Sequence, residues 1–145
     1  RAGHRGGTLF GLDLDAQRRI VELVAALVTA DYPAVLVDAL HDVSSGGLGL
    51  CLAEGAAATG VGATVGGVDG HGGLFSESPG RVVLCSSRPE EVLSRAEAAG
   101  VPAAVIGTAG GERLAVEGLV DLPVAELVRA WRRALPAALG DAVPA

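Results

Sequence analysis

Residues 40–54 read Leu-His-Asp-Val-Ser-Ser-Gly-Gly-Leu-Gly-Leu-Cys-Leu-Ala-Glu, which places a polar cluster directly before an apolar helical run. Serine hydroxyls are typical helix caps, so we expect Ser44 or Ser45 to begin a helix near Gly46. Gly46 and Gly47 remove side-chain bulk where a ligand could approach the free N–H groups of the first turn. A helix start of this kind favours an anion such as phosphate or carboxylate, with His41 as an added donor.

The same cluster has a second interpretation, in which it is only a capped helix entry after a tight turn. His41 then satisfies a neighbouring carbonyl, and two glycines before a helix are a weak sign of a ligand. His41, Asp42 and Ser44 lie too close in sequence to place nucleophile, base and orienting group in line. A metal site from His41, Asp42 and Glu54 has no recognised spacing. We therefore predict no catalytic and no metal-binding residues.

A second polar cluster, with Glu77, Ser78 and Arg81, comes just before the most apolar stretch expected to be a strand. Residues at the mouth of a strand are well placed to face a ligand held on a rigid scaffold. The alternative is a surface ion pair between Glu77 and Arg81 across the turn at Pro79-Gly80, worth about 0–1 kcal/mol. Both interpretations stay open on residue types alone.

Apolar periodicity predicts alternating groups of helices and strands. We expect helices over residues 16–30, 46–59, 88–99 and 123–135, and strands over 34–38, 61–68, 81–86, 101–108 and 113–118. Asp15 and Ser87 are expected caps, residues 69–73 are typical of a loop, residues 109–111 indicate a hairpin, and Trp131 should be at least half buried. Since strands and helices do not strictly alternate, we predict an α/β (α+β) fold with a mixed, largely antiparallel sheet packed with helices.

Composition narrows the class of protein. The net charge of the 145 residues is −6, which argues against nucleic acid as a partner, and Lys is absent, which excludes a P-loop or Schiff-base lysine. No apolar run reaches the ~20 residues of a membrane span, and we expect no signal peptide. We expect a cytoplasmic protein in which Cys51 and Cys85 are isolated reduced thiols.

Domain organisation is predicted from length and from the ends of the chain. The length fits one domain or a piece of a larger enzyme, and the absence of Met, including at position 1, indicates a processed chain or a fragment. We expect residues 1–14 to be a linker, residues 15–140 to form one α/β domain, and residues 141–145 to be a frayed tail.

Four stretches carry a resemblance to a known family. They are "HDVSSGGLGLCLAE" (41–54), "GLFSESPGRVVL" (73–84), "VPAAVIGT" (101–108) and "ELVRAWRRALPAALG" (126–140). In this order they resemble the C-terminal domain of the phosphoribosylformylglycinamidine synthases, over about residues 3–140. HDxSxGGL marks the superfamily that includes aminoimidazole ribonucleotide synthetase, whereas FSESxGRV and the closing AWxxALPxLxG pattern point to the synthases.

The resemblance implies a part in an ATP-dependent carbon–nitrogen ligase of purine biosynthesis. These synthases convert formylglycinamide ribonucleotide, ATP and glutamine-derived ammonia to formylglycinamidine ribonucleotide, ADP and phosphate. The family pattern implies a missing N-terminal barrel domain, joined through residues 1–14, that binds ATP and magnesium, and a glutaminase subunit or domain as partner. Without the barrel, we expect an inactive chain that self-associates through its uncovered face. The alternative is a non-catalytic interaction module descended from the same superfamily.

The resemblance also implies which residues face a ligand. The candidates are His41, Asp42, Ser44, Ser45, Gly46, Gly47, Glu77, Ser78 and Arg81. The chain resembles the second half of the duplicated synthase, which implies a structural or auxiliary nucleotide role. Two positions depart from the family. Pro79 replaces the Gln of a substrate-contacting Glu-Ser-Gln segment of the first half, and Ser45 replaces a usual acidic residue, which removes a charge–dipole interaction of typically 0.3–1 kcal/mol.

Overall fold

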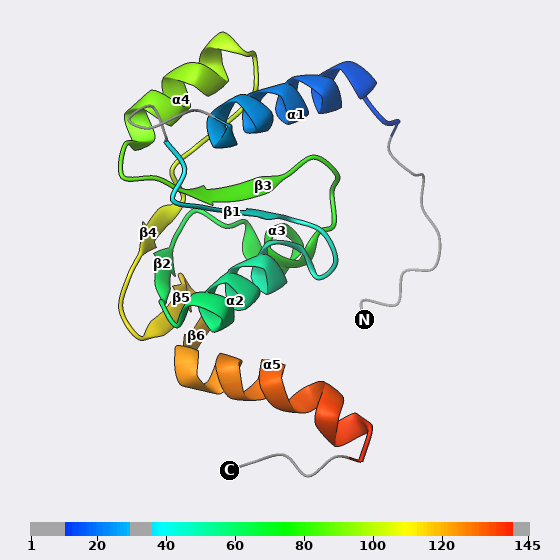
Figure 1. The fold of residues 1–145 in the computed structure, drawn as a ribbon, viewed down its shortest axis with the longest axis vertical. Helices are drawn as coiled ribbons and strands as arrows, with labels where there is room; N and C mark the ends of the chain where they lie inside the picture. The colour runs from blue at the N-terminus through cyan, green and yellow to red at the C-terminus, as the bar shows by residue number, and fades with distance from the viewer. Residues whose placement is uncertain (1–10, 30–35, 141–145) are drawn as a thin grey trace.

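The computed structural model describes residues 11–29 and 36–140, in which helices and strands are interleaved (Figure 1). The helices are α1 (Leu14–Val28), α2 (Gly47–Thr59), α3 (Gly70–Phe75), α4 (Pro89–Ala98) and α5 (Val124–Ala138). The strands are β1 (Ala39–Asp42), β2 (Ala63–Val65), β3 (Val82–Cys85), β4 (Gly107–Ala109), β5 (Arg113–Val116) and β6 (Val120–Pro123). Across these ranges, no helix combines the length and apolar character that a membrane crossing requires.

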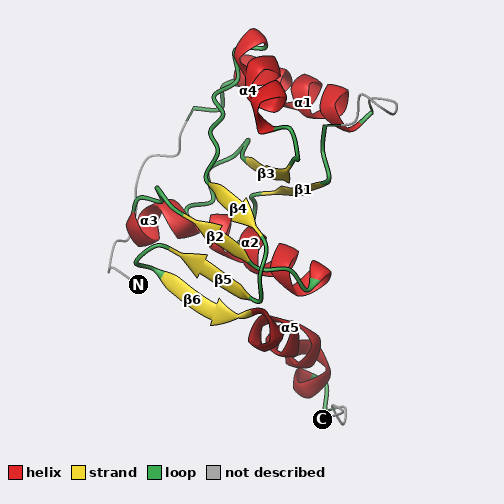
Figure 2. Ribbon diagram, turned by 90° about the vertical axis from the view of Figure 1, so that its left-hand side faces the viewer, coloured by secondary structure: helices red, strands yellow, loops and turns green. Residues whose placement is uncertain are grey.

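The strands form two sheets, not the single sheet that the sequence predicts. β1 and β3 pair antiparallel, and the other strands form a sheet in the order β4-β2-β5-β6, visible edge to edge in Figure 2. Within that sheet β2 and β5 run parallel, while β2–β4 and β5–β6 are antiparallel. The prediction of a mixed, largely antiparallel α/β arrangement is therefore confirmed, although the sheet is split.

Two hydrophobic clusters hold the layers together. The first joins α1 and α4 through Leu27, Leu36 and Val92, with Leu84 of β3 packed against it. The second joins β2, α3 and β5 through Val65, Leu74 and Val116. In Figure 1, α1 and α4 lie on one side of the β1–β3 pair and α2 and α3 on the other. The β1–β3 pair is thus the layer that positions the segments on either side of it.

Helix boundaries follow capping chemistry, with some corrections. α1 is capped by Asp13, whose carboxylate accepts from the Ala16 amide at 2.9 Å, so the expected Asp15 cap is wrong. α4 has Pro89 in its first turn as expected, but its N-cap is Arg88 and not Ser87. Residues 69–73, predicted as loop, mostly belong to α3, where the fully buried Leu74 offsets the poor helix propensity of glycine.

The expected strand over 34–38 is displaced along the chain. Residues 34 and 35 lie outside the described residues, and the strand begins at Ala39, although the Asp38 amide already donates to the Cys85 carbonyl at 2.9 Å. The buried side chain of Leu36 joins the first cluster instead of a sheet. At the other end of the chain, Trp131 is 55% exposed, so the expectation of half burial is wrong. α5 extends away from the four-stranded sheet in Figure 1, and Leu135, further along this helix, is also exposed.

β4 and β5 do not form the hairpin predicted at residues 109–111, because β2 lies between them. Gly62, just before β2, forms backbone hydrogen bonds with the loop that joins β4 to β5. Its amide donates to the Gly111 carbonyl at 2.8 Å, and its carbonyl accepts from the Gly110 amide at 2.7 Å. A Cβ on Gly62 would lie 2.7 Å from the backbone nitrogen of Arg113, closer than real Cβ atoms come. Gly110 and Gly111 therefore hydrogen-bond to the residue just before β2 instead of closing a tight turn between β4 and β5.

Candidate functional site

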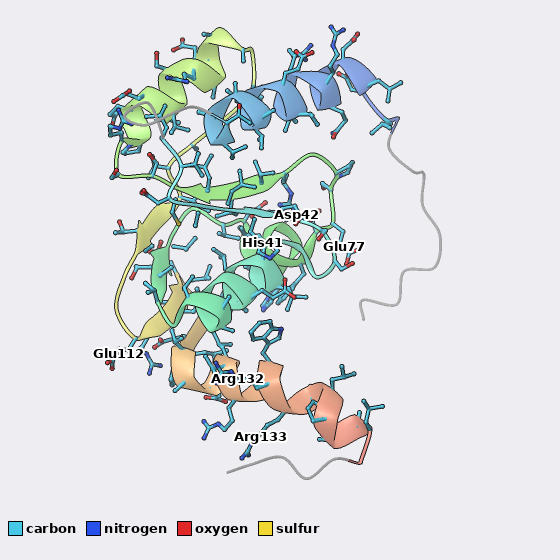
Figure 3. All side chains as sticks on the ribbon, in the orientation of Figure 1. His41, Asp42, Glu77, Glu112, Arg132 and Arg133 are labelled. Carbon is cyan, nitrogen blue, oxygen red and sulfur yellow. The ribbon has the colours of Figure 1, made fainter. Side chains whose placement is uncertain are left out.

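The two polar clusters meet in the fold although they lie 31 residues apart. The Gly46 amide, at the start of α2, donates a hydrogen bond to Glu77 Oε1 at 2.8 Å. Figure 3 shows Glu77 beside the turn that carries His41 and Asp42 into α2. The structure thus brings residues 41–47 and 76–81 to one place, as the candidate site requires.

The start of α2 differs from its prediction, because neither Ser44 nor Ser45 caps it. The N-cap is Gly46, in a left-handed conformation with φ +77°, and it has no side-chain cap. The Gly47 amide instead donates to the backbone carbonyl of Ser44 at 3.0 Å. The carboxylate of Glu77, from a distant segment, supplies the acceptor that a local hydroxyl was expected to give. The anion at this helix start is therefore one of the chain's own side chains.

The two glycines are explained by contacts within the protein. Both have positive φ values, which side chains other than glycine rarely adopt. A Cβ on Gly46 would lie 2.6 Å from the Leu50 Cβ, and one on Gly47 would lie 2.7 Å from the Ser76 carbonyl oxygen. Leu50 of the same helix thus requires glycine at position 46, and the packing of α2 against residues 74–76 requires it at position 47, so the admission of a ligand stays a prediction.

His41 and Asp42 hold the turn before α2. His41 Nδ1 lies 2.7 Å from the Asp42 carbonyl oxygen, and its Nε2 lies 3.4 Å from Glu54 Oε2. The hydrogen bond from the Ser44 hydroxyl is the main reason that the pKa of Asp42 lies below its ordinary value, with smaller contributions from its own backbone N–H and from His41. The expected contact of His41 with a neighbouring carbonyl is confirmed.

The segment before β3 is tied together by its own polar groups. Arg81 donates from Nη2 to the Ser76 carbonyl, and the hydroxyls of Ser76 and Ser78 lie 2.7 Å apart. Since Glu77 binds the Gly46 amide, the alternative of a Glu77–Arg81 ion pair is wrong for the described residues. The Arg81 Nε atom is buried and has no hydrogen-bond partner in the described part of the chain.

Both segments border a groove of about 670 Å³ whose opposite wall is α1. Besides candidate residues Asp42, Ser44, Ser45, Glu77 and Arg81, the lining includes Gln17, Ile20, Val21, Val24, Ala25, Val43, Pro79, Gly80 and Val82. The other four candidates do not line the groove: His41 of β1 contacts Glu54, Gly46 and Gly47 lie at the start of α2, and Ser78 contacts Ser76. Sequence reasoning missed the wall from α1. The apolar periodicity that predicted the helix over residues 16–30 was a signal, but such periodicity predicts a buried face and not an open groove.

The arrangement offers little to a metal ion. Among residues 11–29 and 36–140, no three His, Cys, Asp or Glu side chains are grouped so that they could hold one. Cys51 and Cys85 are both free, as expected. Cys51 is buried in α2, and this burial raises the pKa of its thiol to about 11, so it stays protonated at neutral pH.

Comparisons with known proteins give consistent relatives. The chain is 45% identical over 141 residues to phosphoribosylformylglycinamidine synthase subunit PurL of Nocardioides sp., and 39% identical over 138 residues to PurL of Rhodospirillum rubrum. These matches cover 95% and 92% of this chain but 18% of each relative. The chain therefore spans about a fifth of the length of the curated relatives it matches.

Solved structures share the fold. The Thermotoga maritima PurLQS structure superposes with a TM-score of 0.69 at 22% identity, covering 83% of this chain and 23% of that one. T. maritima PurL complexed with ATP superposes with the same TM-score and identity and covers 86% of this chain and 23% of that one. The family described as "AIR synthase related protein, C-terminal domain" matches residues 11–118, which include α1, both polar clusters and β5. Fold, sequence and motif positions agree, and the chain belongs to this AIR synthase related family, as a C-terminal domain.

Proposed function

We propose that the chain is the C-terminal domain of a PurL-type phosphoribosylformylglycinamidine synthase. The whole protein would convert formylglycinamide ribonucleotide, ATP and glutamine-derived ammonia to formylglycinamidine ribonucleotide in the cytoplasm. The identity to PurL subunits over nearly all of this chain supports the assignment. Because the chain covers 18% of those relatives, we assign the reaction to the longer protein, in which this chain supplies part of the active site.

One observation carries the role of this domain: the hydrogen bond from the Gly46 amide to Glu77, which joins the two polar clusters beside the groove. We assign ligand contact to this edge, through His41, Asp42, Ser44, Ser45, Gly46, Gly47, Glu77, Ser78 and Arg81. Arg81 is the cationic side chain of the groove lining, and a ligand phosphate would have to displace Glu77 from the Gly46 amide.

The remaining components of the reaction are assigned outside this domain. The described residues do not fit a magnesium site, since no suitable group of carboxylates is present among them. ATP is bound in one of the T. maritima PurL structures, and we assign both the metal and the main nucleotide contacts to the barrel domain. We also propose that a glutaminase subunit or domain supplies the ammonia to the whole protein.

A domain exchange tests the function directly. The matching segment of the Nocardioides PurL is replaced by this chain, and formylglycinamidine ribonucleotide synthesis is assayed with ATP, magnesium and ammonia. We expect the chimera to keep a kcat within about tenfold of the parent, because the exchanged domains share 45% identity. A folded chimera without activity would contradict the proposal and favour a non-catalytic interaction module.

The groove is tested in the same chimera by Ser45→Tyr. Ser45 is exposed and lines the groove, so a large side chain there should hinder a ligand without disturbing the core. We expect KM for ATP or for the ribonucleotide to rise about tenfold or more, with an unchanged melting temperature. Ser94→Tyr, on the exposed face of α4, is the matched control. Equal kinetics for both variants would remove the groove from the site.

A further inference from the structure

A narrow apolar stripe runs along α5 and is buried at one end only. Its residues recur at alternating steps of four and three: Val124, Val128, Trp131, Leu135 and Ala138. Side chains with this spacing share one side of a helix and form the kind of seam that packs against another helix. We call these five residues the α5 seam. Val124 is 4% exposed and Val128 is partly buried, whereas Trp131 is 55% and Leu135 is 68% exposed.

The domain itself supplies a neighbour for the start of this helix. α5 packs against α2, and Figure 1 shows it continuing away from the four-stranded sheet. Trp131 and Leu135 therefore extend the line of Val124 and Val128 into solvent. Burial of one such large apolar side chain is worth about 1.5–3 kcal/mol. The exposed end of the α5 seam thus suits an element that continues the packing begun inside the domain.

The far half of α5 also differs in charge from the rest of the chain. Residues 127–140 contain Arg129, Arg132, Arg133 and no acidic residue, a net charge of +3. The other residues contain 8 Arg and 17 Asp or Glu, a net charge of −9. At 3.6 residues per turn, Arg132 lies directly beside the α5 seam, whereas Arg129 lies further round the helix. A complementary helix therefore has acidic side chains along one edge of its apolar stripe.

We propose that the α5 seam docks an acidic amphipathic helix from the part of the longer protein that lies outside these 145 residues. This docking rests on the proposed function, under which the chain is about a fifth of a PurL-type protein. One helix against another buries less than the roughly 1,000 Å² of a stable independent interface. A covalent connection suits so small a contact, because it raises the effective concentration of the docking helix to about millimolar.

Charge and shape disfavour two other occupants. A second copy that paired α5 with α5 would bring the same basic residues together, and the net charge of −6 on each copy adds repulsion. Helices that lie on anionic membranes have a wide apolar face and a strongly basic polar face. Here the stripe is narrow, and Ala134, not a basic residue, borders it on the side opposite Arg132.

Hydroxyl-radical footprinting of the domain-exchange chimera and of the 145-residue chain tests the proposal. Trp131 is the one Trp of the chain, and mass spectrometry of its peptide gives its oxidation rate. We expect oxidation to be several-fold slower in the chimera, because docking covers an indole that is half exposed in this domain. Urea-unfolded samples of both proteins give the rate of a fully exposed indole. Equal rates in the two folded proteins would overturn the proposal.

The same measurement separates the docking from the proposed function and from the other occupants. Unprotected Trp131 in a chimera that synthesises formylglycinamidine ribonucleotide would reject the docking and keep the function. Protected Trp131 in a folded but inactive chimera would keep the docking and reject the function. In the isolated chain, a rate that falls with protein concentration would identify a second copy as the occupant. A rate that falls on addition of phosphatidylserine vesicles would identify a membrane, and either result would overturn the proposal.

A matched pair of variants in the chimera tests the acidic character of the docking helix. Arg132→Glu reverses the charge beside the α5 seam, whereas Arg129→Glu makes the same change at an exposed position of the same helix, further from the seam. We expect Arg132→Glu to raise the oxidation rate of Trp131 toward that of the isolated chain and Arg129→Glu to leave it low. Circular dichroism checks that both variants are folded. Equal protection in both would overturn the assignment of an acidic helix.

Discussion

At the scale of single residues, close contacts within the protein explain several glycines that the sequence suggested were there for a ligand or a turn. Gly46 is needed because a Cβ there would meet Leu50 of α2 itself, Gly47 because α2 packs closely on residues 74–76, and Gly62 because its backbone bonds to the β4–β5 loop. The glycines and their preference for turns were visible in the sequence. Their neighbours were not, because those contacts join segments that are distant along the chain.

Gly62→Ala should destabilise the fold by about 1–3 kcal/mol, since the added Cβ would meet the backbone of Arg113 at 2.7 Å or less and backbone atoms cannot easily move aside. Gly55→Ala is the control, because that position in α2 has open space and alanine favours a helix by about 0.5–1 kcal/mol. Urea unfolding of both variants measures the difference. Similar free energies of unfolding for the two would contradict the close packing at Gly62.

Cys51 makes stability depend on pH in the alkaline range. Burial raises the pKa of its thiol from 9.0 to about 11, so between these values the unfolded chain loses a proton that the folded chain keeps. Stability is therefore fully present below about pH 9 and falls by roughly 2–3 kcal/mol as the pH rises to 11. With no Lys and one Tyr in the chain, few other groups titrate in this range.

The measurement is the free energy of unfolding between pH 8 and 11, on a scale where one pKa unit is about 1.4 kcal/mol. Cys51→Ala should flatten the slope, whereas Cys85→Ala, at the partly buried free thiol of β3, should retain it. Parallel slopes in both variants would show that Cys51 is not the group responsible.

At the scale of elements, the sequence predicts most helices well and strand partners poorly. α2 and α4 lie within about one residue of their predicted bounds, because apolar periodicity and first-turn chemistry are local signals. The β4–β5 hairpin was wrong, because the insertion of β2 between two strands that are adjacent in sequence leaves no local mark. α3 was missed because its glycines suggest a loop, and only tertiary burial of Leu74 favours the helix.

The candidate site, too, could be predicted from the sequence only in part. Both polar clusters were visible as departures from an apolar background, and the structure brings them together. The capping residue was wrong, because Glu77 reaches the Gly46 amide from 31 residues away and no local rule ranks that acceptor above Ser44 or Ser45. The wall from α1 could not be foreseen, since an apolar stripe predicts burial without naming what covers it.

Trp131→Ala tests how α5 is stabilised. The side chain is 55% exposed, and the helix is anchored near its start, where Val124 is buried and its amide donates to the Glu112 carbonyl at 2.9 Å. We expect the substitution to cost about 1 kcal/mol or less, against the 3–5 kcal/mol typical of a buried aromatic residue. Chemical unfolding measures the cost, with Val124→Ala as the comparison at a buried position. A loss above about 3 kcal/mol would mean that Trp131 is packed against another element in solution.

At the scale of the whole molecule, the chain has two clusters of buried residues and one open groove among its described residues. The relatives contain about five times as much chain, and the described residues offer no group that could hold a metal. The cationic side chain of the groove lining, Arg81, is engaged with the Ser76 carbonyl. A phosphoryl-transfer reaction needs more positive charge around the phosphates than this domain presents.

We therefore expect the isolated chain to produce no formylglycinamidine ribonucleotide when supplied with ATP, magnesium, ammonia and formylglycinamide ribonucleotide. ADP release should stay at the level of the buffer, because Arg81 is the one cationic side chain among the residues that line the groove, and the amide at the start of α2 already binds Glu77. The control is the domain-exchange chimera, in which the same chain is joined to the rest of PurL and should support turnover. Turnover by the isolated chain that Ser45→Tyr abolishes and Ser94→Tyr does not would show that this domain carries a complete active site of its own.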